Sequence, residues 1–522
     1  MRFEPEGFEA QVAPGTTLHA AAAEAGVRLE APCGGLGRCG SCRVRVTGDV
    51  GAPRATEQEA LSGADAAAGI RLACLARAEG PGPVTVERIG VLAGEGLQVA
   101  AAVPVAASAA ASVAGGRSGW GVAVDVGTTT LAAAGYDLGS GASLGTAAAF
   151  NPQIRFGHDV LTRVSRALAG DADELREVLA RAIEQTALRA GGESRGAPSE
   201  VMVVGNPTML HLLLGLDVSA LAAAPYEGAL TERLDLDAAD AGLPAFGDAR
   251  VRVGPAVSAF VGADVVAGLL ATGLAASEYP ALFIDLGTNG EMVLATRTVL
   301  LAASAAGGPA LEGVSIEHGM RAEPGAVERV RWRGGELEIG VVRDIDPVGI
   351  CGTGLLDLAA VLLDAGALDV SGRLQASGPL ASRVEETPDG MRFRLTETVY
   401  LTQRDVRQLQ LAKGAVATAV GILVETAGLS PDAVREVVIA GGFGTHVNPA
   451  SLAAIGMVPA AWADRITFAG NTALGGASAM LLDPALIDAA SALAAKVRTV
   501  DLAGREYFQS RFIASLDFPS AG

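Results

Sequence analysis

The chain has 522 residues, of which 50% are hydrophobic and only 4% aromatic, so it is too long for one hydrophobic core and predicts three or four structural units. Its formal net charge of −19 disfavours nucleic acid as a partner, because binding phosphate backbones needs clustered Lys and Arg. Met1 to Ala10 lacks the apolar core of a secretory signal, and the longest apolar run, Leu97 to Val113, is interrupted and too short to span a membrane, so we expect a cytoplasmic protein without a membrane partner.

The first 92 residues predict a small mixed α/β domain. Alternating apolar and polar residues at Cys42 to Val46 and Val84 to Val86 predict short strands, and Leu18 to Ala25 predicts a helix. Residues 93–118 then change to Ala, Gly, Val and Ser with almost no charge, which is typical of a flexible linker. Such a linker would let the first domain change its position.

Beyond the linker, apolar strand-like runs end in glycine-rich turns at three places: Gly121 to Val126, Ala281 to Leu286 and Val437 to Ala440. Helical stretches separate these runs, so the class is α/β. The turn after the first run, residues 125–129, resembles the turn after the second, residues 285–289. This similarity favours a duplicated unit, with one lobe at 119–280 and a second at 281–522.

Four of the five cysteines lie within the first 74 residues. Three of them have the spacing C-x5-C-x2-C in a glycine-rich loop, and the fourth follows 31 residues later: Cys33, Cys39, Cys42 and Cys74. Four thiolates satisfy the two irons of a [2Fe–2S] cluster, and glycines let backbone N–H groups approach the sulfides. A structural zinc site or buried free thiols remain alternatives, although zinc usually has paired close spacings.

This domain resembles the ferredoxin β-grasp family, in which a three-cysteine loop follows a helix and a distant fourth cysteine completes the site. Five residues between the first two cysteines are similar to the adrenodoxin-type spacing, whereas the plant type has four. Arg38, Arg43 and Arg45 lie near the loop. They either dock on an acidic surface or form a solvated face.

The glycine-rich turns predict a nucleotide site. A carboxylate at a strand end followed by Gly and Thr offers backbone N–H groups and hydroxyls to phosphate, and the carboxylate can hold Mg²⁺ through water. The first turn supplies Asp125, Gly127, Thr128, Thr129 and Thr130, and the second supplies Asp285, Gly287, Thr288, Asn289 and Glu291. The third, with Gly441, Gly442 and Gly444, lets adenosine lie against bare backbone. The chain has no Walker-type phosphate loop.

In this order the turns resemble the phosphate-1, phosphate-2 and adenosine motifs of the actin-like ASKHA superfamily, which implies a duplicated ribonuclease-H-like fold that binds ATP. Residues 262–264 and 470–477 resemble its two connecting helices. Asp264, Glu291 and Glu312 are the candidates for orienting an attacking water, because phosphoryl transfer needs positioning and charge neutralisation. Glu291 is favoured because it lies inside a phosphate motif.

The order of ferredoxin, linker and ASKHA lobes resembles that of the reductive activators of corrinoid proteins. The resemblance extends over most of the chain and includes residues 151–153, 204–211, 305–310, 349–354 and 402–406. It implies an ATP-hydrolysing activase that takes electrons from an upstream donor and reduces cob(II)alamin to cob(I)alamin in a corrinoid protein of a methyltransferase system.

Two other functions remain open: a redox-sensing ATP-binding module without net electron delivery, and a small-molecule kinase with an accessory ferredoxin. The sequence also leaves open whether the protein is a homodimer. Cys351 stands alone between apolar residues and glycine, without the second cysteine that related dehydratase activases need for a shared cluster. We interpret it as a packed structural residue.

Overall fold

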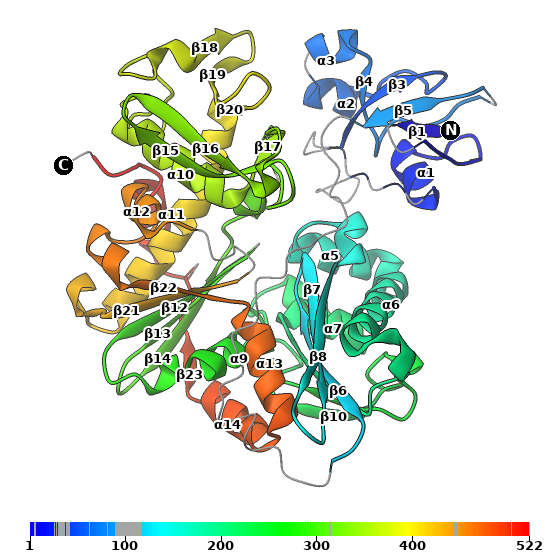
Figure 1. The fold of residues 1–522 in the computed structure, drawn as a ribbon, viewed down its shortest axis with the longest axis vertical. Helices are drawn as coiled ribbons and strands as arrows, with labels where there is room; N and C mark the ends of the chain where they lie inside the picture. The colour runs from blue at the N-terminus through cyan, green and yellow to red at the C-terminus, as the bar shows by residue number, and fades with distance from the viewer. Residues whose placement is uncertain are drawn as a thin grey trace.

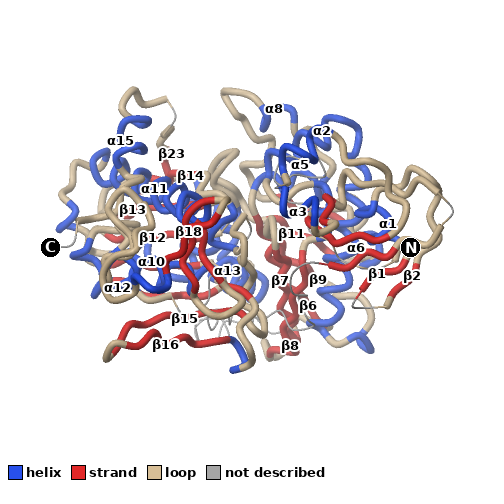
Figure 2. Tube along the Cα trace, turned by 90° about the horizontal axis from the view of Figure 1, so that it is seen from above, coloured by secondary structure: helices blue, strands red, loops and turns tan. Residues whose placement is uncertain are grey.

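The computed structural model describes residues 1–4, 7–25, 27, 29, 37, 42–61, 63–80, 82–88, 117–287, 289–313, 315–441, 447–502 and 504–520. The first domain, residues 1–88, lies beside two larger lobes (Figure 1). Seen from above, it lies over the lobe that contains β6, β7 and β9 (Figure 2). The predicted linker, residues 93–118, lies outside the described residues except for Arg117 and Ser118.

The first domain is a five-stranded sheet in the order β2-β1-β5-β3-β4, packed against a helix. Its core includes Phe3, Leu18, Val44, Leu72 and Val86. The predicted helix and strands are confirmed, with small shifts at their ends. The elements are β1 (Arg2–Glu4), β2 (Phe8–Glu9), α1 (Leu18–Glu24), β3 (Arg43–Thr47), α2 (Ala55–Ala60), α3 (Gly63–Ala67), β4 (Ile70–Leu72) and β5 (Thr85–Arg88).

The first lobe contains a six-stranded sheet in the order β10-β11-β9-β6-β7-β8. Its central strands β6 and β9 are buried along nearly their whole length, which explains why their sequences are continuous apolar runs. The elements are β6 (Trp120–Val126), β7 (Thr130–Asp137), β8 (Ser143–Phe150), α5 (Val160–Arg166), α6 (Ala172–Gly191), β9 (Glu200–Gly205), α7 (Pro207–Leu214), α8 (Ser219–Ala222), β10 (Leu234–Asp237), β11 (Arg250–Val253) and α9 (Ala263–Thr272).

The second lobe contains another six-stranded sheet, in the order β22-β21-β12-β13-β14-β23. Its strands are β12 (Ala281–Leu286), β13 (Gly290–Ala295), β14 (Leu300–Ala305), β21 (Glu436–Ala440), β22 (Ile466–Gly470) and β23 (Val497–Thr499). Two three-stranded sheets extend it: β15 (Ala326–Arg333), β16 (Glu336–Val341) and β17 (Gly349–Ile350), then β18 (Val384–Thr387), β19 (Gly390–Arg394) and β20 (Tyr400–Thr402). Its helices are α10 (Gly352–Asp364), α11 (Gln403–Thr426), α12 (Pro449–Ala454) and α15 (Phe508–Ala514). The late helices α13 (Thr472–Leu482) and α14 (Ala485–Ala494) pack instead into the core of the first lobe.

The two large sheets repeat one topology, which confirms the predicted duplication. In the first lobe, β6 forms an antiparallel hairpin with β7 and pairs in parallel with β9. In the second, β12 forms the same hairpin with β13 and pairs in parallel with β21. The equivalent positions of β6 and β12 place the two predicted phosphate turns at the ends of matching strands.

Helices α9 and α13 cross at very close range between the two sheets. A Cβ atom added at Gly476 of α13 would lie 2.1 Å from the carbonyl oxygen of Ala267 in α9. A Cβ atom at Gly268 would lie 2.8 Å from Oγ1 of Thr472. Glycine is therefore required at this crossing, and the predicted connecting helices form the contact between the lobes (Figure 1).

Among the described residues, α11 is the one helix that is long and apolar enough to cross a membrane. It lies within the second lobe, where 72% of its most apolar window is buried by other parts of the protein. Thr402 and Asp405 form a reciprocal capping box at its start. This pattern is typical of a core helix.

Candidate functional site

The two lobes share a cavity lined by every predicted nucleotide residue that the structure describes. These are Asp125, Gly127, Thr128, Thr129, Thr130, Asp285, Gly287, Asn289, Glu291 and Gly441. Thr288, Gly442 and Gly444, which were also predicted, lie outside the described residues. Residues more than 300 positions apart in the chain therefore meet at one place.

The two phosphate turns have the same internal hydrogen bond. The N–H of Gly127 donates to the carbonyl of Thr130, and the N–H of Gly287 donates to that of Asn289, each at 3.0 Å. A Cβ atom at Gly127 would lie 2.6 Å from the Thr130 oxygen, so the first turn has no space for a side chain. Gly441 has a φ of +107°, and its Cβ would lie 2.4 Å from the carbonyl of Leu286. Glycine is required at both places.

Four half-buried carboxylates in the cavity have raised pKa values. Loss of hydration is the main cause for each, and Coulombic repulsion from Asp264 adds to it at the other three. The pKa is about 8 for Asp125, about 7 for Asp285 and about 6 for Asp264, and that of Glu291 is well above its usual range. A cation bound here would relieve the repulsion.

Three polar residues of the cavity were not assigned roles in the sequence analysis. Asn471 donates from Nδ2 to Oδ2 of Asp125 at 2.9 Å and accepts from the N–H of Leu474 at the start of α13. Asn206 donates to Oγ1 of Thr128 at 2.8 Å. The sequence signal for both residues was an Asn directly before an apolar helix, which is typical of a helix N-cap.

The third residue, Thr472, has a deeply buried hydroxyl with no hydrogen-bond partner within the described part of the chain. Buried polar groups are usually satisfied, so this hydroxyl fits a cavity that takes a polar ligand. Together with the glycine turns and the carboxylates, it makes the cavity chemically suited to a nucleotide phosphate and its cation. Among the described residues, however, no three His, Cys, Asp or Glu side chains group closely enough to bind a metal directly.

A segment of the second lobe reaches across the cavity to the first. Glu312 accepts a hydrogen bond of 3.0 Å from Oγ1 of Thr129. The guanidinium carbon of Arg321 lies 4.4 Å from the centre of the Phe150 ring. Glu312 was a candidate for orienting water, and the structure also gives it a role in joining the lobes.

In the first domain, the two described cysteines of the predicted cluster site converge. Sγ of Cys42 lies 3.2 Å from Sγ of Cys74, and both residues are buried. The N–H of Ala73 donates to the carbonyl of Cys42 at 2.8 Å, which holds the two chain segments together. Cys33 and Cys39 lie outside the described residues. The two converging thiols fit ligands of one cluster.

The arginines near the cysteine loop have defined partners. Arg43 directly follows Cys42 and lies 3.4 Å from Asp65 of its own domain and 3.3 Å from Glu317 of the second lobe. Arg45 pairs within its sheet with Glu87 at 2.7 Å. Arg38 lies outside the described residues. Arg43 therefore contacts one acidic residue of the second lobe, whereas Arg45 pairs within its own domain and is about half exposed.

Cys351 lies in the wall of the nucleotide cavity, directly before α10. Its thiol is buried and contacts the carbonyl of Val327 and the hydroxyl of Thr353. Burial raises the pKa of this thiol. These contacts are consistent with the structural role that we predicted.

Three family models match consecutive parts of the chain. The 2Fe-2S iron-sulfur cluster binding domain matches residues 1–79, the RACo middle region matches residues 120–277, and the C-terminal domain of RACo, the ASKHA domain, matches residues 279–522. The chain therefore has an iron–sulfur domain, a middle region and an ATP-binding ASKHA domain in the predicted order.

Individual proteins are similar over most of the chain. A solved structure described as a reductive activator for a corrinoid, iron-sulfur protein has a TM-score of 0.71 and 28% identity, covering 99% of this chain and 98% of that one. The Co(II) methylated amine-specific corrinoid protein reductase of Methanosarcina barkeri is 27% identical over 77% of this chain and 78% of its own length.

The corrinoid activation enzyme RamQ of Eubacterium limosum is 33% identical over 70% of this chain. The match spans 64% of the length of RamQ, which is somewhat less than two thirds. All three relatives are named for corrinoid activation or reduction, and the three family models cover the first domain and both lobes. The two RACo models together match residues 120–277 and 279–522, so the chain belongs to the RACo family, and a 2Fe-2S domain precedes these two regions.

Proposed function

We propose that this protein couples ATP hydrolysis to the transfer of one electron from its [2Fe–2S] cluster to a corrinoid protein, which converts cob(II)alamin to cob(I)alamin. The observation that carries the proposal is the presence, in one chain, of converging cluster cysteines and a two-lobed cavity suited to a nucleotide. The names of the relatives support corrinoid protein as the partner. An upstream protein donor would reload the cluster in a reducing cytoplasm.

At the nucleotide, the proposed roles follow the chemistry of the cavity. The backbone N–H groups and hydroxyls of the turns that contain Gly127 and Gly287 bind phosphate oxygens, and Gly441, which lines the cavity, leaves space for adenosine. The sequence predicts the same role for Gly442 and Gly444. Asp125 and Asp285 hold Mg²⁺ through water, which offsets the repulsion between the carboxylates. Glu291 orients the attacking water.

In the first domain, Cys33, Cys39, Cys42 and Cys74 hold the cluster, which supplies a one-electron carrier when bound. Burial of Cys42 and Cys74 limits contact between their thiolates and water. Arg43 keeps the strand after Cys42 close to the second lobe through Glu317. The lobes open and close with the nucleotide cycle and so change how the corrinoid partner is held.

The first experiment tests the two sites separately. After anaerobic reconstitution, we expect two irons and two acid-labile sulfides per chain, lost in the Cys42→Ser and Cys74→Ser variants. Stoichiometric zinc without labile sulfide would exclude the cluster. The variants Asp125→Ala and Asp285→Ala should retain the cluster spectrum but weaken Mg-ATP binding or turnover, and unchanged ATPase activity in both would exclude the nucleotide assignment.

The second experiment tests the coupling. Reduced protein, Mg-ATP and a corrinoid protein of a methyltransferase system are mixed anaerobically while the cob(II)alamin absorbance is recorded. Partner-dependent ATP turnover with loss of that absorbance supports the activase. A nucleotide-dependent change in the first domain without cob(II)alamin loss supports the sensing module, and a phosphorylated small molecule supports the kinase.

A further inference from the structure

Asn151 directly follows β8 and holds the first phosphate turn at two places. Its N–H donates to the carbonyl of Thr129 at 2.9 Å, and its Nδ2 atom donates to the carbonyl of Gly127 at 2.9 Å. The N–H of Thr128 lies on the opposite edge of the same peptide plane as the Gly127 carbonyl, so it points away from Asn151. Thr128 lines the nucleotide cavity. The contact from Asn151 therefore leaves this N–H group for the ligand.

Buried polar side chains continue behind Asn151. Oε1 of Gln153 accepts from Nδ2 of Asn151 at 3.4 Å and from Nη1 of Arg163 on α5 at 3.2 Å. Arg163 also donates from Nε to the carbonyl of Gly157 at 2.8 Å and from Nη1 to the sulfur of Met209 at 3.1 Å. Asn151, Gln153 and Arg163 are each 0% exposed. The first phosphate turn is thus connected to a fully buried guanidinium of the first lobe.

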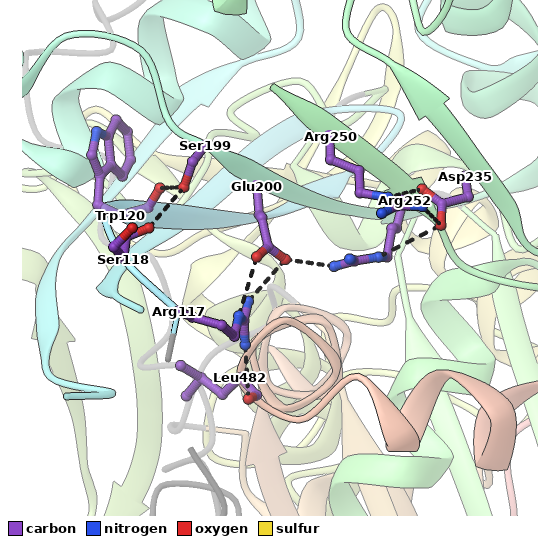
Figure 3. Close-up of polar contacts among 9 residues, drawn as sticks. All are labelled: Arg117, Ser118, Trp120, Ser199, Glu200, Asp235, Arg250, Arg252 and Leu482. Atoms are coloured by element: carbon purple, nitrogen blue, oxygen red, sulfur yellow. Dashed lines mark hydrogen bonds and ion pairs between the residues drawn. The ribbon is translucent and has the colours of Figure 1, made fainter. Parts of the chain in front are cut away.

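Arg163 differs in its partners from Arg117 and Arg252, which are also shielded from water. Those two side chains are each 17% exposed, and both donate to the carboxylate of Glu200 (Figure 3). The acceptors of Arg163 are all neutral, and its Nη2 atom is buried without a hydrogen-bond partner within the described part of the chain. A buried cation without an ion pair destabilises a fold, so its presence indicates a role in binding or catalysis.

The charge of Arg163 extends to the nucleotide cavity. Burial lowers the pKa of its guanidinium to about 9, and the carboxylates of Asp159 and Glu312 oppose this effect. Arg163 therefore remains a cation at neutral pH. Glu312 lines the cavity and accepts a hydrogen bond from Oγ1 of Thr129 in the first phosphate turn. Because buried charges are weakly screened, Arg163 acts electrostatically on the wall of the cavity at this turn.

The lining of the cavity supplies little positive charge. Among the described residues, six carboxyl side chains line it: Asp125, Asp264, Asp285, Glu291, Glu312 and Glu323. Arg321 is the one basic side chain in the same described lining. A nucleoside triphosphate with one Mg²⁺ keeps a net negative charge. A second cation behind the phosphate turn therefore favours binding of the nucleotide.

We propose that Arg163 is a positioning residue for the phosphates of the nucleotide. It fixes Gln153, and through Gln153 and Asn151 it fixes the first phosphate turn, while the bound phosphates balance its charge. A carboxylate beside Arg163 would cancel its positive potential at the turn, which explains why its partners are neutral. This inference rests on the proposed nucleotide site and does not depend on electron delivery to a corrinoid protein.

The first test measures how the effect of Arg163 depends on the number of phosphates. ATP, ADP and AMP, each with Mg²⁺, displace a fluorescent ATP analogue from the full-length, cluster-loaded parent, Arg163→Met and Arg252→Met proteins. We expect Arg163→Met to lose at least about tenfold in affinity for ATP, the value of one charge-assisted hydrogen bond, and least for AMP. Arg252→Met removes a partner of Glu200 outside the cavity lining and should bind all three nucleotides like the parent.

Two further variants separate the charge from the geometry. Arg163→Lys keeps the charge but loses the planar set of donors, so it should lose less affinity for ATP than Arg163→Met. Asn151→Ser keeps an N-cap oxygen for the N–H of Gln153, but its shorter side chain does not reach the carbonyl of Gly127. We expect Asn151→Ser to weaken ATP binding more than AMP binding, with an unfolding temperature close to that of the parent.

The outcomes separate this proposal from the proposed function. An Arg163→Met protein that binds ATP as tightly as the parent, or that loses affinity for ATP and AMP equally, overturns the role of Arg163. A parent protein that does not bind Mg-ATP overturns the proposed nucleotide site itself. If Arg163→Met does not unfold cooperatively, Arg163→Lys and Asn151→Ser provide the comparison, and equal losses for ATP and AMP in both variants overturn the proposal.

Discussion

Nδ2 of Asn471 lies 2.9 Å from Oδ2 of Asp125, and this hydrogen bond joins the end of the second sheet to the first phosphate strand. Asn471 directly follows β22, whereas Asp125 lies in β6. The same amide accepts from the N–H of Leu474 and caps α13. The side chain of Asn471 thus orients the carboxylate of Asp125 in the cavity and caps the N-terminus of α13, the helix between the lobes.

Substitutions at Asn471 should separate these two roles. Asn471→Ser keeps a good N-cap but is too short to reach Asp125, whereas Asn471→Ala loses both contacts. We expect both variants to weaken Mg-ATP binding to a similar extent, by isothermal titration. Only the Ala variant should also lose about 0.5–2 kcal/mol of unfolding free energy from the missing cap. Equal stability of the two variants would contradict the capping role.

The raised carboxylate pKa values predict a pH-dependent stability of the nucleotide-free protein. The folded protein holds protons on Asp125 and Asp285 up to about pH 8 and 7, whereas the unfolded chain releases them near 3.8. The stability that these protons contribute is therefore fully present below the unfolded pKa and is lost as pH rises through the folded values. We expect the unfolding temperature to fall as the pH rises from about 4 to about 8 and to level off above about pH 8.

Asp125→Asn removes one of these titrating groups while keeping its size, so the unfolding temperature of this variant should depend less steeply on pH. Mg-ATP should restore stability most at high pH, because the cation replaces the lost protons. Differential scanning calorimetry at several pH values checks both results. If the unfolding temperature of this variant depends on pH as steeply as that of the parent, Asp125 is excluded as the cause.

The buried ion pair of Glu57 with Arg71 predicts an effect on the thermal stability of the iron–sulfur domain. Its fully buried carboxylate accepts from Nε and Nη2 of Arg71 at 2.8 and 3.0 Å and from the N–H of Leu72 at 2.8 Å, two residues before Cys74. Breaking a buried pair of this kind costs about 3–5 kcal/mol. Glu57→Gln should therefore lose cluster absorbance at lower temperature than Glu87→Gln, which removes only the exposed pair with Arg45. Equal loss temperatures would contradict this role.

The contact between Arg43 and Glu317 predicts an electrostatic effect on domain position. Both side chains are partly exposed, so the pair is weak and sensitive to salt. Glu317→Arg places like charges together. It should shift the distance between the reduced, paramagnetic cluster and a nitroxide attached through Gln185→Cys on the exposed face of α6. The double variant Arg43→Glu with Glu317→Arg should restore the parent distance. A double variant that behaves like Glu317→Arg alone would show that the pair does not hold the domain.

Much of this protein could be predicted from residues that are close together in the sequence. The spacing of Cys33, Cys39, Cys42 and Cys74, the repeated Asp–x–Gly–Thr turns at Asp125 and Asp285, and the change in composition at residue 93 each depend on neighbouring residues. They predicted the iron–sulfur domain, the duplicated lobes and the cavity residues, because cluster ligation and phosphate turns need particular residue types at short range.

Packing decided the contacts that join these parts. Asn471 meets Asp125 across 346 residues, and Arg117 meets Leu482 across 365. Glu312 resembled a catalytic carboxylate in the sequence, and in the fold it also binds Thr129 of the opposite lobe. Contacts of this kind cannot be recognised from the sequence, because the partners are hundreds of residues apart or lie on different lobes. They form only when the close crossing of α9 and α13 sets the distance between the two sheets.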